Sequence, residues 1–166
     1  MSHLWTPWRM AYLQGENPLP TECLFCVKAR QSDAEAHIVH RGKLCYVVLN
    51  RFPYNNGHLM VVPYVHVNTL EDMEIDAMTE LMTLTKLSLR VLRQAYHPQG
   101  FNIGFNIGTV AGAGIAGHIH LHVVPRWGGD TNYMTITGQT RVIPEWIDQT
   151  YQRLRPLFER LALNPD

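Results

Sequence analysis

The histidines His118, His120 and His122 alternate with apolar residues in the segment HIHLHVV, residues 118–124. On a strand, alternate side chains point to the same face, about 6.6–7 Å apart, so we expect the three imidazoles to line one face. Imidazole is a nucleophile in its neutral form and a donor to phosphate in its charged form, and its pKa lies near neutrality. The spacing therefore predicts a site that attacks a phosphorylated substrate.

The segment before these histidines, GTVAGAGIAG at residues 108–117, contains four glycines. Glycine permits backbone conformations in which several N–H groups converge on an anion. Two alternatives are a three-histidine metal cage, since His-x-His is common in zinc sites, and a stack of structural histidines. A metal ligand needs no such loop whereas a phosphate does, so the loop favours phosphate chemistry.

A second group that could do chemistry is the pair Cys23 and Cys26 in CLFC. Cys-x-x-Cys is half of a tetrahedral zinc site. A redox pair is less favoured because the motif does not lie between a strand and a helix of a thioredoxin-like pattern, and two free buried cysteines are the remaining alternative. His37 and His40 are candidates for further ligands, whereas Cys45 falls within a strand pattern that indicates core.

The composition indicates a single globular domain over residues 1–166, because 46% of the residues are hydrophobic and 17% are charged. The formal net charge is zero, which argues against a long nucleic acid as partner. A secretory signal and a membrane-spanning apolar run are both missing from the sequence, so we expect a cytoplasmic protein with no membrane partner. Residues 1–22 form an aromatic N-terminal arm that should pack on its own domain or on a second subunit.

The elements that must position the histidines follow from hydrophobic periodicity. Period-two and β-branched runs predict strands, and apolar residues at helical spacing predict two helices. The expected strands are 44–49, 58–63, 101–107 and 118–125, and the expected helices are 69–96 and 144–162. Residues 50–57 form the turn of a hairpin. Short strands with tight turns and two helices predict an α+β domain with an antiparallel sheet.

The segment HIHLHVVPRW resembles the histidine-triad (HIT) superfamily of nucleotide hydrolases and transferases. The stretches LWTPWRMAYL, VVLNRFPYNNGHLMVVPY, GFNIGFNIGT and HVVPRWGGDTN resemble its bacterial branch, which is similar to diadenosine tetraphosphate phosphorylases. Together they cover most of the chain from Leu4 to about Pro144. The resemblance implies a HIT-like α+β fold, with an antiparallel sheet of about five strands, a long helix and a C-terminal helix, in a homodimer.

The resemblance also implies roles for single histidines. His120 matches the nucleophile that forms a nucleotidyl-histidine intermediate, and His122 matches the residue that contacts phosphate oxygens beside it. His58 matches a fourth histidine that orients the triad. His118 completes the catalytic set as the first triad member.

Three further positions match nucleotide-binding residues of the family, and a fourth departs from its pattern. Asn50 matches a position near the ribose, and Asn106 and Gly112 match residues that frame the phosphates. Gly114 is a departure, because many relatives carry Gln or Ser four residues before the first triad histidine. A phosphate contact at that point must therefore come from the backbone or be absent.

Some members of the superfamily carry a structural zinc, and the resemblance assigns its ligands to Cys23, Cys26, His66 and His118. A zinc-bound His118 could not donate freely to phosphate and would instead tie the metal to the catalytic strand. The resemblance thus gives His118 two competing roles.

The activity implied is nucleotidyl transfer from dinucleoside polyphosphates, and the small Gly114 favours inorganic phosphate over water as second nucleophile. A divalent cation bound with the substrate would lower the charge of the leaving group. The alternatives are a hydrolase that releases a nucleoside monophosphate from a dinucleoside polyphosphate or a phosphoramidate, and a nucleotide-binding module with little turnover. A zinc-dependent hydrolase is a third alternative, and it predicts inactivation by chelators.

Overall fold

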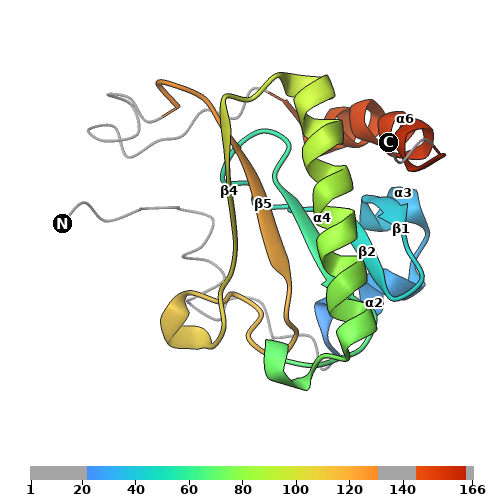
Figure 1. Cartoon of the computed structure of the whole chain (residues 1–166), viewed down its shortest axis with the longest axis vertical. Coiled ribbons are helices and arrows are strands. Elements are labelled where there is room, and N and C mark those ends of the chain that lie inside the picture. The colour runs from blue at the N-terminus through green and yellow to red at the C-terminus, as the bar shows by residue number, and fades with distance from the viewer. Residues whose placement is uncertain (1–21, 131–144, 164–166) are drawn as a thin grey trace.

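The computed structural model of the chain describes residues 22–130 and 145–163. Within them, five strands form one antiparallel sheet in the order β1-β2-β3-β5-β4 (Figure 1). The strands are β1 (Ile38–Arg41), β2 (Cys45–Leu49), β3 (Leu59–Pro63), β4 (Gly100–Phe105) and β5 (Leu121–Arg126), and the helices are α2 (Leu24–Arg30), α3 (Asp33–Ala36), α4 (Ile75–Tyr96) and α6 (Ile147–Leu163). The prediction of an α+β fold with a five-stranded antiparallel sheet, a long helix and a C-terminal helix is confirmed.

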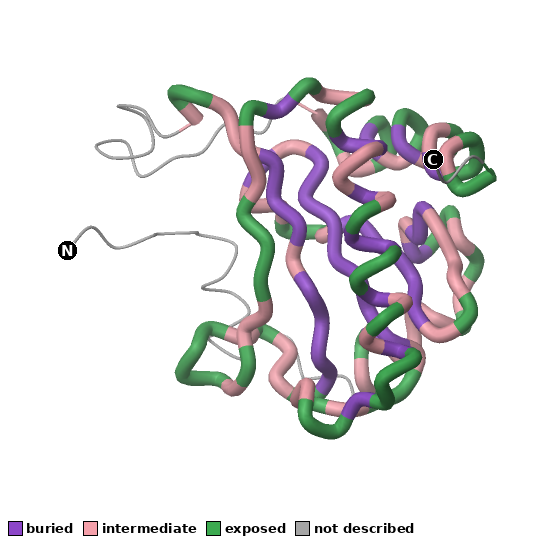
Figure 2. Tube along the Cα trace, in the orientation of Figure 1, coloured by how far each residue is buried: buried purple, intermediate pink, exposed green. Residues whose placement is uncertain are grey.

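The sheet carries a different core on each face. Cys45, Val47 and Leu49 of β2 pack into the core beneath α4 and α6, whereas Tyr46 and Val48 pack on the opposite face with residues from α2 and α3. Figure 2 shows the central strands buried along their length, while α4 is buried only on the side toward the sheet. Such two-sided burial explains why β2 and β3 are continuous apolar runs.

The long helix α4 is shorter than expected at its start. A 3-10 helix, Leu70–Asp72, precedes it, and α4 begins at Ile75 instead of Thr69. The expected apolar stripe is correct at Leu81, Val91 and Leu92, which are buried, but wrong at Met82, which is 55% exposed. None of the described helices is long and apolar enough to cross a membrane.

The strand expected over residues 118–125 begins only at Leu121, so the prediction is wrong for His118 and His120. Before that point the chain leaves the strand ladder, and the Ile119 N–H donates to the Val67 carbonyl at 2.7 Å. The alternation of faces nevertheless persists, because Ile119, Leu121 and Val123 enter the core beneath α4. The three histidines are thereby left to the other side.

Several boundaries and elements differ from the expectations. β1, α2 and α3 were not expected; they have four, seven and four residues, too short for a clear periodic signal. β4 covers residues 100–105 instead of 101–107, and α6 begins at Ile147 instead of Pro144. The N-terminal arm, apart from Glu22, lies outside the described residues, and so does Pro144.

Candidate active site and metal site

The site is built where β3 meets β5. The register pairs Met60 with His122, which brings His58, just before β3, beside the same histidine. His58 Nε2 lies 2.9 Å from His122 Nδ1, and the Tyr54 N–H donates to His58 Nδ1 at 3.0 Å. The ring of Tyr54 also lies 4.6 Å from the ring of His58.

These contacts fix the position of the proton on two rings. Because His58 Nδ1 accepts a hydrogen bond, its proton resides on Nε2 and is donated to His122 Nδ1. The proton of His122 then resides on Nε2, from which it can be donated to a phosphate oxygen. Burial, together with the neighbouring His122 and His120, holds the pKa of His58 well below its ordinary value, so His58 is neutral.

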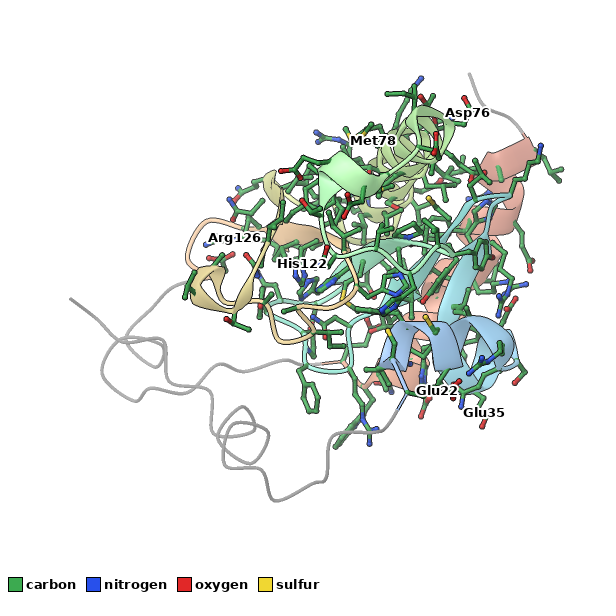
Figure 3. All side chains as sticks on the ribbon, turned by 90° about the horizontal axis from the view of Figure 1, so that it is seen from below. Glu22, Glu35, Asp76, Met78, His122 and Arg126 are labelled. Carbon is green, nitrogen blue, oxygen red and sulfur yellow. The ribbon has the colours of Figure 1, made fainter. Side chains whose placement is uncertain are left out.

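His120 has the complementary arrangement. Its Nδ1–H donates to the backbone carbonyl of His118 at 2.8 Å, which leaves the lone pair on Nε2. Burial lowers the pKa of His120, and the hydrogen bond to His118 opposes that only in part. The rings of His120 and His122 are 4.8 Å apart, and His122 lies on β5 with Arg126, both labelled in Figure 3. An imidazole with its lone pair on Nε2 thus lies beside a second imidazole whose proton is on Nε2.

Phe25 of α2 covers His120. Its ring lies 4.7 Å from that of His120 and 5.5 Å from that of His118, and the side chain is 1% exposed. The Phe25 carbonyl accepts a hydrogen bond from the Tyr46 hydroxyl at 2.8 Å, which ties α2 to the sheet. The sequence analysis missed Phe25, although its place between the two cysteines of CLFC was an available signal.

At the other end of the histidine segment, four ligand atoms of Cys23, Cys26, His66 and His118 lie within 4.8 Å of one another. His118 Nδ1 is 3.4 Å from Cys23 Sγ, 3.6 Å from Cys26 Sγ and 3.2 Å from His66 Nδ1, and Cys26 Sγ is 3.4 Å from His66 Nδ1. Ligands of a tetrahedral zinc site with two sulfur and two nitrogen atoms are about 3.3–3.8 Å apart. The donor set and its spacing fit zinc.

Both nitrogens of His118 are committed. Its Nε2–H donates to the Pro63 carbonyl at 2.9 Å, so the lone pair of Nδ1 points toward the cysteines. With Nε2 bonded to the Pro63 carbonyl and Nδ1 turned to the cysteines, the His118 ring has no nitrogen directed at His120, and only its backbone carbonyl contacts the ring of His120. The alternative ligands are wrong, because His37 contacts Asp148 at 2.8 Å and His40 stacks on Phe158.

Of the expected nucleotide-binding residues, Asn50 contacts a site histidine. Asn50 directly follows β2 with Nδ2 at 3.3 Å from His58 Nδ1, and Asn106 directly follows β4 and is half-buried. Gly112 has a φ of +88°, and a Cβ added at Gly112 or Gly114 would meet nothing within 4 Å. Gly114 is exposed, and these four assignments stay predictions.

Comparisons with known proteins match the chain to one family model and to curated relatives. A family model described as the HIT domain matches residues 31–129. AP-4-A phosphorylase of Mycobacterium tuberculosis is 46% identical over 168 residues, which cover 96% of this chain and 86% of that protein. The bis(5'-nucleosyl)-tetraphosphatase of Schizosaccharomyces pombe is 30% identical over 55% of this chain and 50% of its own.

Solved structures show the same fold. A zinc-bound histidine triad family protein from Mycobacterium smegmatis superposes with a TM-score of 0.69 and 26% identity, over 86% of this chain and 96% of its own. A histidine triad nucleotide-binding protein from Sulfolobus tokodaii superposes with a TM-score of 0.67 and 23% identity, over 84% of this chain and 94% of its own.

Proposed function

The chain belongs to the HIT family, and from that premise we propose that it is an enzyme that attacks dinucleoside polyphosphates, such as diadenosine tetraphosphate, with His120. One observation carries the proposal: the Nδ1–H of His120 is held by the His118 carbonyl, so the lone pair lies on Nε2 beside His122. A binding module would need neither this tautomer nor a neighbouring proton donor.

In the first step, His120 Nε2 bonds to the α-phosphorus and the bond to the bridging oxygen breaks. The products are a nucleotidyl-histidine and a nucleoside polyphosphate leaving group. His122, whose tautomer is fixed by His58, donates from Nε2 to the oxygen on which negative charge develops. Backbone N–H groups of residues 112–117 are the proposed partners of the other phosphoryl oxygens. A divalent cation bound to the substrate would lower the charge of the leaving group.

In the second step, inorganic phosphate attacks the nucleotidyl-histidine, restores His120 and releases a nucleoside diphosphate. The 46% identity to AP-4-A phosphorylase supports phosphate over water, and the absence of a side chain at Gly114 is compatible with that choice. The hydrolase alternative, in which water releases a nucleoside monophosphate, draws support from the similarity to the tetraphosphatase.

The products formed from diadenosine tetraphosphate with and without inorganic phosphate distinguish the two branches. Phosphorolysis gives ADP and ATP, requires phosphate, and transfers labelled phosphate into ADP. If AMP and ATP form at the same rate without phosphate, the hydrolase branch is correct and phosphorolysis is wrong.

We further propose one structural zinc per chain, held by Cys23, Cys26, His66 and His118. When bound, zinc would cross-link α2 to the histidine segment and would supply no part of the phosphoryl chemistry. Elemental analysis of protein purified without a histidine tag should give one zinc per chain, and none in Cys23→Ser/Cys26→Ser. Rapid inactivation of folded protein by a chelator, with full recovery on adding zinc, would favour the zinc-dependent hydrolase instead.

The homodimer and the cytoplasmic location also stay proposals. β4 lies at one edge of the sheet, and its Ile103 is 45% exposed, which supports a partner along this strand. Light scattering at micromolar concentration should give twice the chain mass of 19.0 kDa, and a single chain mass would contradict the dimer.

A further inference from the structure

A polar cluster outside the histidines joins the end of β5 to the loop of residues 50–57. Asp130 accepts from Arg126 at both carboxylate oxygens, at 2.6 and 2.7 Å, and from the Trp127 N–H at 3.3 Å. The amide of Asn55 donates to Asp130 Oδ2 at 2.9 Å and to the Pro125 carbonyl at 3.0 Å. The side chain of Asp130 and the residue Asn55 are each only 9% exposed. The mechanism above uses none of these side chains.

The cluster reaches His58 through the loop backbone. The Asn55 carbonyl accepts the His58 N–H at 3.2 Å, and the preceding residue, Tyr54, donates its N–H to His58 Nδ1. The loop is also packed at Gly57, where φ is +72° and a Cβ would lie 3.0 Å from Leu92 and Tyr96. The place of Asn55 therefore sets where the Tyr54 N–H points. That N–H is the shorter of two contacts to His58 Nδ1, at 3.0 Å against 3.3 Å for Asn50 Nδ2, and so has the larger part in fixing which nitrogen of His58 carries the proton.

We propose that Asp130, acting through Asn55, is a positioning residue that fixes the proton positions of the His58–His122 pair. The expected effect on catalysis rests on the proposed function, whereas the effect on the proton positions of His58 and His122 does not. The carboxylate is the required group, because it accepts hydrogen bonds from Arg126 and Asn55 and donates none. Hydrogen bonds from Arg126 hold the pKa of Asp130 below its ordinary value, which keeps it ionised at neutral pH.

Asp130→Asn tests this with nearly the same size and shape. The amide of the new asparagine would place N–H groups against the N–H donors of Arg126 and Asn55. The hydrogen bond that holds Asn55, and with it the loop of residues 50–57, would then be weakened. Long-range proton–nitrogen NMR of the histidine rings, in protein without substrate, should show both tautomers of His58 and His122 where the wild type shows one. Rapid-quench measurement should show nucleotidyl-histidine formation slowed by about 10- to 100-fold. The dissociation constant for adenosine nucleotides should change by less than about threefold, because His120 and the expected nucleotide-binding residues are unchanged.

Asp33→Asn is the matched control. Asp33 also accepts from two arginines, Arg41 at 2.6 Å and Arg155, but it lies in α3 and contacts none of the site histidines. Its substitution should lower the melting temperature and leave the histidine tautomers and the chemical step unchanged. If Asp33→Asn slows the chemical step as much as Asp130→Asn does, general destabilisation is the cause and the proposal is overturned.

A second variant covers the case in which Asp130→Asn does not fold. Asn55→Ser keeps the Arg126–Asp130 ion pair and removes the amide that joins it to the loop, so the same mixing of tautomers is expected. Unchanged tautomers in either folded variant overturn the proposal. If the wild type forms no nucleotidyl-histidine, the proposed function fails, and the NMR comparison still decides whether Asp130 positions His58.

Discussion

His118 and His120 are two residues apart in the same segment and on the same face, yet their rings are held in opposite ways. His118 donates from Nε2 to the Pro63 carbonyl and turns Nδ1 to the cysteines. His120 donates from Nδ1 to the His118 carbonyl and keeps its lone pair on Nε2. A single backbone acceptor, by fixing which ring nitrogen carries the proton, thus determines from which side a histidine can bind metal or attack phosphorus.

The two regions also differ in what assembles them. The proposed metal region lies at the start of α2, where Cys23 and Cys26 meet two histidines from distant parts of the chain, His66 and His118. The proposed reactive region consists of His58, His120 and His122. It is assembled by the pairing of β3 with β5, which places His58 beside His122. Phe25 touches the rings of both His118 and His120 and thus joins the regions through side chains, beside the hydrogen bond from His120 to the His118 carbonyl. The comparison predicts that each region can be damaged with limited effect on the other.

The largest effect should come from His120→Ala. Removing the nucleophile should lower turnover of diadenosine tetraphosphate by about 10⁴-fold or more, with one zinc per chain retained. Steady-state rates and elemental analysis measure the two quantities. Near-normal turnover in the purified variant would show that His120 is not the nucleophile. Loss of zinc from the variant would show that the two regions do not act independently.

The converse variant is Cys23→Ser/Cys26→Ser. It should lose zinc, and its melting temperature should fall by about 10 °C or more, because binding of a structural zinc is coupled to folding. Turnover below the transition should fall by only about tenfold, since the metal supports the segment without joining the chemistry. A loss as large as that of His120→Ala in folded protein would mean that the metal region takes part in the reaction.

Phe25→Leu tests the contact between the regions. Zinc should be retained, while the rate of the chemical step should fall by a few-fold because the ring of His120 gains freedom. Phe158→Leu is the control, since Phe158 is equally buried and stacks on His40, which is outside the site. Equal effects of the two variants on kcat would show that the Phe25 contact is only packing.

The smallest expected effect is a loss of folding stability at low pH. It arises from Asp33, which lies outside both regions. Burial raises the pKa of Asp33, but hydrogen bonds from Arg41 and Arg155 outweigh burial and leave that pKa below its ordinary value. Because the folded pKa is the lower one, the stabilising contribution is complete above the unfolded pKa and is lost as pH falls through the folded pKa.

Denaturant unfolding at pH 6 and at pH 3 measures this contribution. The wild type should lose more free energy of unfolding between pH 6 and pH 3 than Asp33→Asn does. The difference between the two losses is the contribution of the Asp33 carboxylate, which lies outside both regions. Parallel loss in the two proteins would contradict the assignment to Asp33.

Much of the chemistry was predictable because it lies in short-range patterns. The alternation of His118, His120 and His122 with apolar residues and the Cys-x-x-Cys spacing predicted which side chains gather, and the resemblance to the HIT family supplied His58 and His66. The two helices and the β2–β3 hairpin also follow from periodicity, although their boundaries shift by a few residues.

The parts of the fold and of the site that the sequence did not predict depend on tertiary contacts, which leave no local sequence pattern. The strand was extended too far toward His118, because nothing in the sequence shows that the Ile119 N–H bonds to Val67. Asn55 and Asp130 are 75 residues apart and resemble ordinary turn residues, so their contact becomes visible only in the fold. Of the two roles that the resemblance gave His118, the hydrogen bond to the Pro63 carbonyl favours the metal role, because it turns Nδ1 toward the cysteines.

The most direct test of the division between His118 and His120 is to locate the covalent intermediate. Diadenosine tetraphosphate with a labelled α-phosphate is mixed with the zinc-loaded enzyme, quenched in alkali to preserve phosphoramidates, and the labelled peptide is mapped by mass spectrometry. We expect adenylyl label on His120 alone, in protein that still holds one zinc per chain. Label on His118 or His122, or turnover with no labelled histidine at any time, would contradict the division.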